Sequence, residues 1–580
     1  MKQIAPVLAL AMASGVLVGA SPPAQGTPAV AHSMHGSGFH RGHSMRAMLM
    51  MSASVVKPAS VKKVPLYDGL GTLNFTVTTT SPEAQRYFSQ GLAFAYGFNH
   101  AGAIASFREA QRLDPECGMC WWGEAFAHGP NINAPMDAAA NARAFDAAVH
   151  ADWLARKGTP EERALTAAMV KRYSLDTKAD RAALDATFAD AMLAAAGAHP
   201  EHDDIGLLAA EAIMNTKPWD YWTADKKPNQ RIGEAVRLVE TVLARNPAHP
   251  QAAHLYIHLM ENGPDPKLAE AAADRLNAPL APRLGHLVHM PAHIYYLLGR
   301  WQDSIRVNIA AARADEAWIK ESGDKGLVRY GYYPHNVHFI VTSAQMAGEM
   351  PTAIREARKL ETLLDPGVSS QIAWIQAVNA APYFAAAQFA TPAEILAMRA
   401  PDARLPYPTG MRFYARAIAR AQQRNRTGFE QELTRLRAVR NSDALNPMIE
   451  QGAPAGDLLH LAEIVAHARW ATANGRLSEA VRLYRQAVAI EQKIPYMEPP
   501  FWYYPVHQSL GATLYRVGRY REAREAFKTA LAQSPNNGWA LYGLAAAELA
   551  LGRRDAARAA NLALKKAWSG NRAWLRMDRL

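Results

Sequence analysis

The sequence predicts an all-α protein in which pairs of antiparallel helices stack one after another. Its 580 residues are rich in Ala, Leu and Arg, and 49% are hydrophobic while 20% are charged, a globular composition that favours helix. Small residues and a proline recur at fixed positions of a 34-residue unit, and such a period is typical of helical repeats. Only Tyr67–Thr80 has strand-like composition, and we expect a short strand or a lead-in arm there.

The N-terminus has the pattern of a secretory signal peptide. Lys2 supplies a positive charge, Ile4–Val18 is apolar, and small residues allow cleavage after Ala20 or Ala31. The apolar run is too short to span a bilayer comfortably, and no later segment is apolar enough. We therefore expect a periplasmic or secreted bacterial protein with no membrane span, an uncleaved anchor being the alternative. The net charge of +11 is spread without long basic runs, and no motif indicates a nucleic-acid partner.

A segment of low complexity follows the signal and is expected to be disordered. It is rich in histidine and methionine: His32, His35, His40, His43, Met34, Met45, Met48, Met50 and Met51. Imidazole and thioether donors together suit copper. A plain flexible linker is the alternative interpretation.

The clearest repeat unit is Tyr504–Asn537. Its characteristic small residues and terminal proline include Gly511, Ala523, Ala530 and Pro535. Small residues let two helices approach closely, and proline ends the second helix. This unit resembles the tetratricopeptide repeat family, and degenerate copies extend the resemblance over about two-thirds of the chain, starting at Ala84. The resemblance implies an α-α solenoid, a right-handed superhelix of helix pairs, but does not identify a function.

Breaks in the repeat pattern divide the chain into five parts. The proline-rich stretch Ala400–Gly410 separates a larger N-terminal array from a C-terminal one. The expected parts are a signal region (1–31), a His/Met-rich tail (32–66), an N-terminal array with a His-rich groove (67–399), a connecting helical segment (400–456) and a C-terminal array (457–580).

Seven of the chain's 20 histidines lie between positions 254 and 338. They are spaced as HxxxH, HxxHxxxH and HxxH, so that each group shares one helix face. In the repeat register they occupy equivalent positions of three successive first helices, a face that lines the concave groove in tetratricopeptide repeats. We therefore expect them to converge on a divalent metal ion: His254, His258, His286, His289, His293, His335 and His338. Imidazole ligands suit copper or zinc, and the His/Met tail favours copper slightly.

Glu261 lies one turn beyond His258 and is a candidate metal ligand, hydrogen-bond acceptor or general base. Aromatic and polar residues near the same elements are candidates for lining a pocket for a small molecule or a peptide: Trp122, Asn131, Asn133, Glu211, Asn215, Trp219, Trp222 and Tyr333. Cys117 and Cys120 are interpreted as a disulfide or unpaired structural residues, a redox dithiol being less favoured.

Three classes of function remain open from the sequence. The first is a metal-binding groove protein, which includes a metal-dependent enzyme. The second is an interaction scaffold that holds a peptide without metal. The third is a periplasmic copper store or chaperone. No nucleophile triad, phosphate-binding glycine loop or dinucleotide fingerprint is present, so the sequence assigns no reaction.

Overall fold

A computed structural model describes residues 65–580 except 177, 279 and 496. The regular elements of this part of the chain are all helices, joined by loops, and no strand occurs in it, which confirms the all-α prediction. The predicted signal region and nearly all of the His/Met-rich tail lie outside the described residues. The segment 67–80 is a lead-in arm and not a strand, because its side chains Leu70, Phe75 and Val77 are buried in the core without strand pairing.

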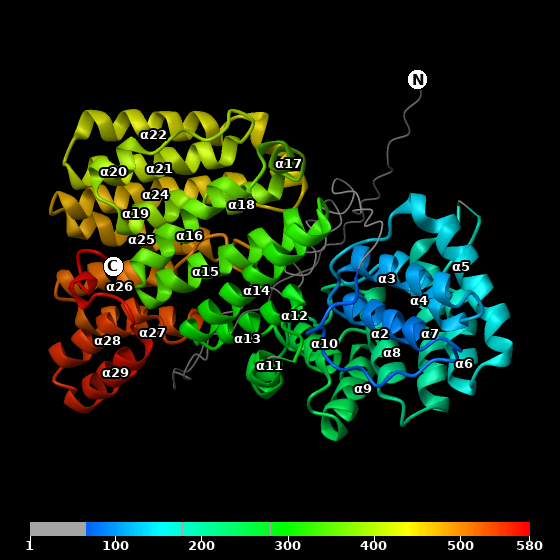
Figure 1. Cartoon of the computed structure of the whole chain (residues 1–580). Coiled ribbons are helices and arrows are strands. Elements are labelled where there is room, and N and C mark those ends of the chain that lie inside the picture. The colour runs from blue at the N-terminus through cyan, green and yellow to red at the C-terminus, as the bar shows by residue number, and fades with distance from the viewer. Residues whose placement is uncertain (1–64, 177, 279, 496) are drawn as a thin grey trace, which may run out of the picture. The chain divides into compact units, whose positions relative to one another are not determined.

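The N-terminal helices follow one another as packed neighbours (Figure 1). They are α2 (Pro82–Tyr96), α3 (His100–Leu113), α4 (Gly118–His128), α5 (Asn141–Leu154), α6 (Pro160–Val170), α7 (Arg181–Ala198), α8 (Asp203–Thr216) and α9 (Ile232–Arg245). The central helices are α10 (Pro250–Met260), α11 (Glu270–Asn277), α12 (Gly285–His289), α13 (Pro291–Leu297), α14 (Trp301–Ser322), the π-helical turn η4 (Val328–Tyr332), α15 (Tyr333–Ala347) and α16 (Met350–Leu363).

The remaining helices lead to the C-terminus, drawn in red in Figure 1. They are α17 (Pro366–Gln371), α18 (Gln376–Asn379), α19 (Ala381–Phe389), α20 (Pro392–Ala397), α21 (Pro406–Gln422), α22 (Arg426–Arg440), α23 (Asn446–Glu450), α24 (Ala455–Ala473), α25 (Leu477–Glu491), α26 (Val506–Arg516), α27 (Tyr520–Gln533), α28 (Gly538–Ala550) and α29 (Arg554–Ala567). Short 3-10 turns lie at Ala138–Ala140, Ala155–Lys157, Pro266–Ala269, Ala373–Ile375, Asp443–Leu445 and Arg572–Trp574.

Near both ends of the described chain, a glycine lets two paired helices approach each other closely. A Cβ atom at Gly123 would lie 2.3 Å from the ring of Phe107, and one at Gly543 would lie 2.2 Å from the ring of Phe527. In each case a glycine gives room to a phenylalanine 16 residues earlier in the chain. The recurrent small residues of the sequence pattern therefore set the spacing between helices.

The C-terminal helices pack back onto the central ones. The indole Nε1 of Trp539 donates to the carbonyl of Gln345 at 2.9 Å, and that of Trp301 donates to the carbonyl of Asn536 at 3.1 Å. The loop between α25 and α26 also lies against α13 and α15, where Glu498 and Tyr503 contact His293 and His338. Among the described residues, no helix combines the length and the apolar character needed to cross a bilayer.

Cys117 and Cys120 form a disulfide at the start of α4. Both cysteines are fully buried, and neither belongs to a group of metal-binding geometry among the described residues. We expect a double replacement by Ala to leave metal content unchanged, as measured by elemental analysis of the folded protein. The disulfide closes a very short loop, so its removal should lower the unfolding free energy by only about 2 kcal/mol. Loss of bound metal in this variant would instead make the cysteines ligands.

Candidate metal centre

Three groups of the described residues have metal-binding geometry: two clusters of histidines, and Glu261 with His293 and Glu498, which shares His293 with the second cluster. The first histidine cluster, here called triad A, comes from two helices. His254 and His258 lie one turn apart on α10, and His286 lies on α12. The Nε2 atoms of His254 and His286 are 3.2 Å apart, and one ligand atom from each of the three residues falls within 4.8 Å of the others. All three side chains are buried, with at most 5% exposed.

A second cluster, triad B, combines His289 of α12, His293 of α13 and His335 of α15. The Nε2 atoms of His289 and His293 are 2.9 Å apart. Pro291 begins α13, so the two histidines lie on two successive short helices and not on one continuous helix. Their side chains still face the same point. Triad B adjoins triad A, since the ring centres of His286 and His289 lie 6.2 Å apart.

Each triad meets the distance requirement of a metal site. Two imidazole nitrogens bound at about 2.0 Å to one tetrahedral ion lie about 3.3 Å apart. The Nε2 pairs of the two triads, at 3.2 and 2.9 Å, are close to this spacing. Small side-chain movements would therefore suffice to place an ion in either triad.

Neutral oxygen acceptors fix the orientation of one histidine in each triad. Nδ1 of His254 lies 2.9 Å from Oε1 of Gln251, whose own Nε2 donates to Glu211. Nδ1 of His289 lies 2.6 Å from Oδ1 of Asn308, whose Nδ2 donates to the carbonyl of Ser304. Because these amide oxygens accept, the proton of each neutral imidazole sits on Nδ1 and the lone pair on Nε2.

Carboxylates perform the same role for His258 and His293. Glu261 accepts from Nδ1 of His258 at 2.7 Å through one oxygen and lies 2.8 Å from Nδ1 of His293 through the other. Glu498, from the loop before α26, also lies 2.6 Å from Nδ1 of His293. Glu261 thus joins the two triads and is positioned to orient both imidazoles.

The protonation of the cluster follows from burial and from these carboxylates. Burial lowers the pKa of His254, His286 and His335 well below the usual value, and the neighbouring imidazoles lower it further. Burial also acts on His293, but Glu261 and Glu498 outweigh it and raise the pKa of His293 to about 10. The neutral members of the cluster are ready to bind a cation, whereas His293 must release a proton from Nε2 first.

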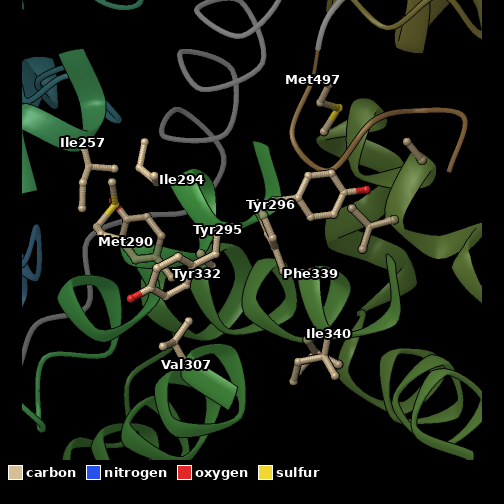
Figure 2. Close-up of a cluster of buried hydrophobic side chains, with 14 of the residues drawn as sticks. Ile257, Met290, Ile294, Tyr295, Tyr296, Val307, Tyr332, Phe339, Ile340 and Met497 are labelled. Atoms are coloured by element: carbon tan, nitrogen blue, oxygen red, sulfur yellow. The ribbon is translucent and has the colours of Figure 1, made fainter. Parts of the chain in front are cut away.

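One phenylalanine packs against every imidazole of each triad. Phe98 lies within 6.0 Å of the rings of triad A, measured between ring centres, and Phe339 lies within 5.1 Å of those of triad B. Figure 2 shows Phe339 and Tyr332 with other buried apolar side chains of this region, among them Met290. These rings exclude water from the clusters. The histidines therefore lie in the packed interior and not on an open concave groove, which corrects that part of the prediction.

His338 is the one predicted ligand that the structure places apart from the triads. It follows His335 by one turn of α15, but its Nε2 accepts from the hydroxyl of Tyr503 at 2.6 Å. Among the described residues, no group of metal-binding geometry includes it. Tyr503 comes from the loop before α26, so a partner distant in sequence turns His338 away from the other imidazoles.

Four of the predicted pocket residues reach the triads directly or through one neighbour. The ring of Trp219 meets His258 edge-on at 5.3 Å, and Glu211 bonds Gln251, the partner of His254. The indole of Trp222 donates to the carbonyl of Leu259 on α10. Asn133 lies near Tyr332, whose ring stacks on His286 at 4.6 Å.

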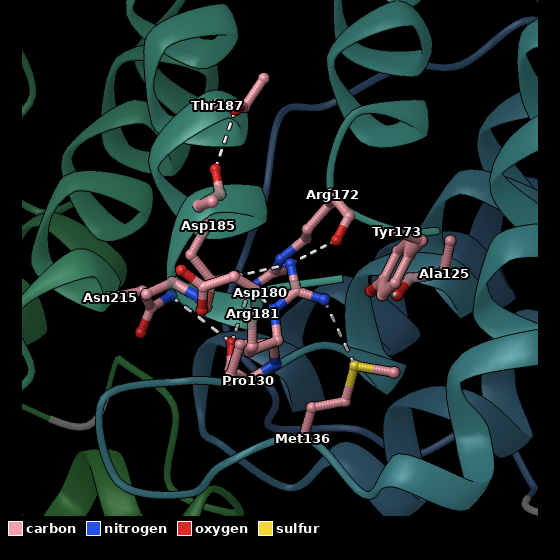
Figure 3. Close-up of polar contacts among 12 residues, drawn as sticks. Ala125, Pro130, Met136, Arg172, Tyr173, Asp180, Arg181, Asp185, Thr187 and Asn215 are labelled. Carbon is pink, nitrogen blue, oxygen red and sulfur yellow. Dashed lines mark hydrogen bonds and ion pairs between the residues drawn. The ribbon is translucent and has the colours of Figure 1, made fainter. Parts of the chain in front are cut away.

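The other four pocket candidates have different surroundings. Trp122 stacks on Phe126 within the core, and Asn131 contacts His100. Figure 3 shows Asn215 beside Pro130, whose carbonyl also accepts from the buried Arg172. The hydroxyl of Tyr333 donates to Glu316 on α14, so Tyr332, and not Tyr333, is the tyrosine that contacts a triad.

Of the side chains that orient the imidazoles, sequence reasoning found Glu261 and missed the other three. Gln251 and Asn308 lie three and 19 residues from their histidines, and Glu498 lies 205 residues from His293. Only Gln251 had a local signal, because a residue three before His254 shares its helix face. Phe98 and Phe339 had none, because aromatic residues are common in repeat cores.

A comparison with protein families supports the repeat assignment near the C-terminus. The family described as "Tetratricopeptide repeat" matches residues 514–573, which include α27, α28 and α29. Residues 514–573 therefore match the tetratricopeptide repeat. The repeat fold is compatible with a protein–protein scaffold. Among curated proteins, nothing matches the chain.

Solved structures of other helical proteins resemble the chain only remotely. A human IFIT1 dimer with PPP-AAAA shares 12% identity over 82% of this chain and 88% of its own, with a TM-score of 0.26. Yeast Tom70 shares 12% identity over 85% of this chain and 94% of its own, with a TM-score of 0.29. At these values the likeness supports no conclusion about site or function.

Proposed function

We propose that the protein is a metalloprotein that binds two divalent transition-metal ions, one in each triad. The observation that carries this proposal is the shared orientation of His254, His258, His289 and His293. Each of their Nδ1 atoms faces a side-chain oxygen, which leaves Nε2 for an ion in the interior of the cluster. A purely structural role would not require five buried imidazoles and the half-buried His335 to gather in this way.

Copper and zinc are the ions that suit these ligands. Imidazole nitrogen binds both, and neither triad contains the sulfur or the many oxygens that other ions prefer. The His/Met-rich segment between His32 and Met51 favours copper, because imidazole and thioether together suit that metal. The signal-like N-terminus supports an exported protein, periplasmic or secreted.

Three imidazoles leave at least one coordination position of each ion open. Such open sites are typical of catalytic metal centres, whereas structural sites are fully ligated by the protein. The arrangement therefore favours a centre that also binds a small molecule, as an enzyme does, over a simple metal store. Glu261, which touches His258 and His293, acts in this proposal through those histidines as a positioning residue.

Elemental analysis of tag-free protein, purified without a nickel column, tests the proposal. We expect about two equivalents of copper or zinc per chain, and their return when chelator-treated protein is dialysed against either metal. Chelator-treated protein that takes up neither ion would refute a metal function. Turnover of small oxidisable or hydrolysable compounds by the loaded protein would then separate an enzyme from a store or chaperone.

A second candidate function is peptide binding by the C-terminal repeats. The match of residues 514–573 to tetratricopeptide repeats is the observation that favours it, because such repeats commonly hold peptides. This function is compatible with the metal centre. Protein that binds no metal but retains a peptide ligand, as detected by mass spectrometry, would favour the scaffold alone.

A further inference from the structure

Residues 568–580, here called the return segment, follow α29 and run back over the C-terminal helix pairs (Figure 1). Two of its side chains, Leu575 and Leu580, are buried, with 7% and 2% exposed. Trp574 is partly buried, and its ring meets that of Phe389 edge-on at 5.6 Å between ring centres. The apolar side chains of the segment therefore pack against the repeat array although the segment belongs to no helix pair.

The return segment contacts the first helix of each of the last three helix pairs. These helices are α24, α26 and α28, which pair with α25, α27 and α29. Arg469 of α24 donates to the carbonyl of Arg579 at 3.4 Å. Asp578 lies near Arg516 of α26 and near Tyr542 of α28. In tetratricopeptide repeats the first helix of each pair lines the concave groove, so the segment occupies the groove of the C-terminal repeats.

Side chains, and not a backbone ladder, hold the return segment in the groove. Its first part is tied to α15, since the backbone N–H of Ser569 donates to the carbonyl of Ala347 at 3.2 Å. Beyond Ser569, backbone hydrogen bonds among the described residues stay within the segment, as where the N–H of Leu575 donates to Arg572 at 3.0 Å. The segment can therefore leave the groove without breaking the hydrogen bonds of any groove helix.

The charges of the groove and of the return segment are poorly matched. Arg469 lies among neutral groups, which are the carbonyl of Arg579, the hydroxyl of Ser509 and the phenols of Tyr414, Tyr484 and Tyr504. The segment itself has three arginines and one aspartate between positions 570 and 580. A ligand with a carboxylate beside Arg469 would gain a charged hydrogen bond that the segment does not provide.

We propose that this groove binds an extended peptide with an aromatic–leucine pair and a carboxylate, and that the return segment competes with that peptide. The inference rests on the second candidate function, peptide binding by the C-terminal repeats. In the free protein Trp574 and Leu575 take the places of the aromatic–leucine pair. The carboxylate of the partner pairs with Arg469, to which the segment offers only a carbonyl. Because segment and groove share one chain, the segment acts at an effective concentration on the order of millimolar, and weak contacts suffice to keep the groove occupied.

A labelled synthetic peptide that copies residues 569–580 is the probe for the released groove. The double variant Trp574→Ala/Leu575→Asp removes two apolar contacts of the segment and leaves every groove helix unchanged. We expect the variant to bind the probe about tenfold more tightly than wild type, the gain for a segment that is docked about nine-tenths of the time. Fluorescence anisotropy measures both affinities. Equal affinities, or no binding to either protein, would overturn the proposal.

Arg572→Ala/Ala573→Asp is the matched control. Both side chains are exposed, lie in the same segment and precede Trp574 directly, and the change introduces the same carboxylate. This variant should bind the probe as wild type does. A gain as large as that of the test variant would mean that the charge of the segment, and not its docking, controls access to the groove, contrary to the proposal.

A second probe with Arg579→Glu tests the carboxylate of the partner. The released variant should bind it about threefold more tightly than the first probe, the gain of a partly exposed ion pair. The difference between the two probes should vanish when Arg469→Gln is added to the released variant. A second probe that binds no more tightly than the first would overturn the chemistry proposed for the partner.

Hydrogen exchange of the wild-type protein detects the docking without any ligand. Backbone amides of residues 571–580 should exchange at least about tenfold faster than those of α27, because the segment opens while the repeats stay folded. Exchange as slow as in α27 would make the segment a fixed part of the fold and overturn this inference. A peptide retained by the protein, as detected by mass spectrometry, would in that case still support the scaffold.

Discussion

Replacement of His289 with Gln should reduce the metal content of the purified protein from two ions per chain to one. His289 belongs only to triad B, so the ligands of triad A remain in place. The same change at His258 should empty triad A, and the double variant should bind no metal. Gln is chosen because it fills much of the volume of the imidazole, whereas Ala would leave a cavity beside Phe339. Elemental analysis after dialysis against excess metal provides the measurement.

His338→Gln is the matched control for this series. His338 is buried, lies on the same helix as His335 and has one imidazole bond, to Tyr503, but it lies outside both triads. We expect it to keep both ions. If His338→Gln lost metal as readily as His335→Gln, or if His289→Gln retained both ions, the division into two triads would be wrong.

Much of the fold was predictable because local spacing determines it. A glycine 16 residues from a phenylalanine recurs at Gly123 and Gly543, and the structure pairs each glycine with its phenylalanine in a close helix contact. The convergence of His254 with His258 was predictable for the same reason, since residues four apart share a helix face. Local rules are sufficient wherever neighbours along the chain are also neighbours in space.

Which histidines form each triad depends on contacts between helices that are distant in sequence. The spacing of the histidines along the chain does not reveal these contacts. His286 and His289 are three residues apart on one short helix, yet His286 groups with the histidines of α10 and His289 with those of α13 and α15. His338 has the same spacing from His335, yet Tyr503 holds it apart. The sequence pattern also predicted an exposed groove, since it could not show that Phe98 and Phe339 cover the imidazoles.

Glu261→Gln should have the largest effect of any single change on the metal-free protein. The carboxylate is buried and faces Nδ1 of His258 with one oxygen and Nδ1 of His293 with the other. The amide of Gln presents only one oxygen, so its NH₂ group must face one of these two donors. Removal of one partner of a buried ion pair costs about 3–5 kcal/mol of unfolding free energy when the other charge is left uncompensated, and Glu498, which also faces Nδ1 of His293, should keep the loss here at the lower end of that range. Denaturant unfolding of chelator-treated protein measures this loss.

The pH dependence of stability should change in the same variant. His293 has its pKa raised to about 10, so its contribution is complete below the unfolded value of about 6.5 and is lost as pH rises through 10. Burial opposes the charge of Glu261, but His293 and His258 lower its pKa to about 2, so its contribution is present above about 4.5 and is lost as pH falls toward 2. Wild-type protein should therefore gain most from this pair between about pH 4.5 and 6.5, and Glu261→Gln should lose that gain.

The same substitution should weaken metal binding in both triads, because Glu261 orients one imidazole of each. Loss of such a partner typically costs 10–100-fold in metal affinity. Glu316→Gln is the matched control: Glu316 pairs with Lys359 and Tyr333 at a half-exposed position, where an ion pair contributes about 0–1 kcal/mol. It should leave both affinities unchanged. If Glu261→Gln weakened metal binding in only one triad, Glu261 would orient a single histidine. The carboxylate would then not support both metal ions.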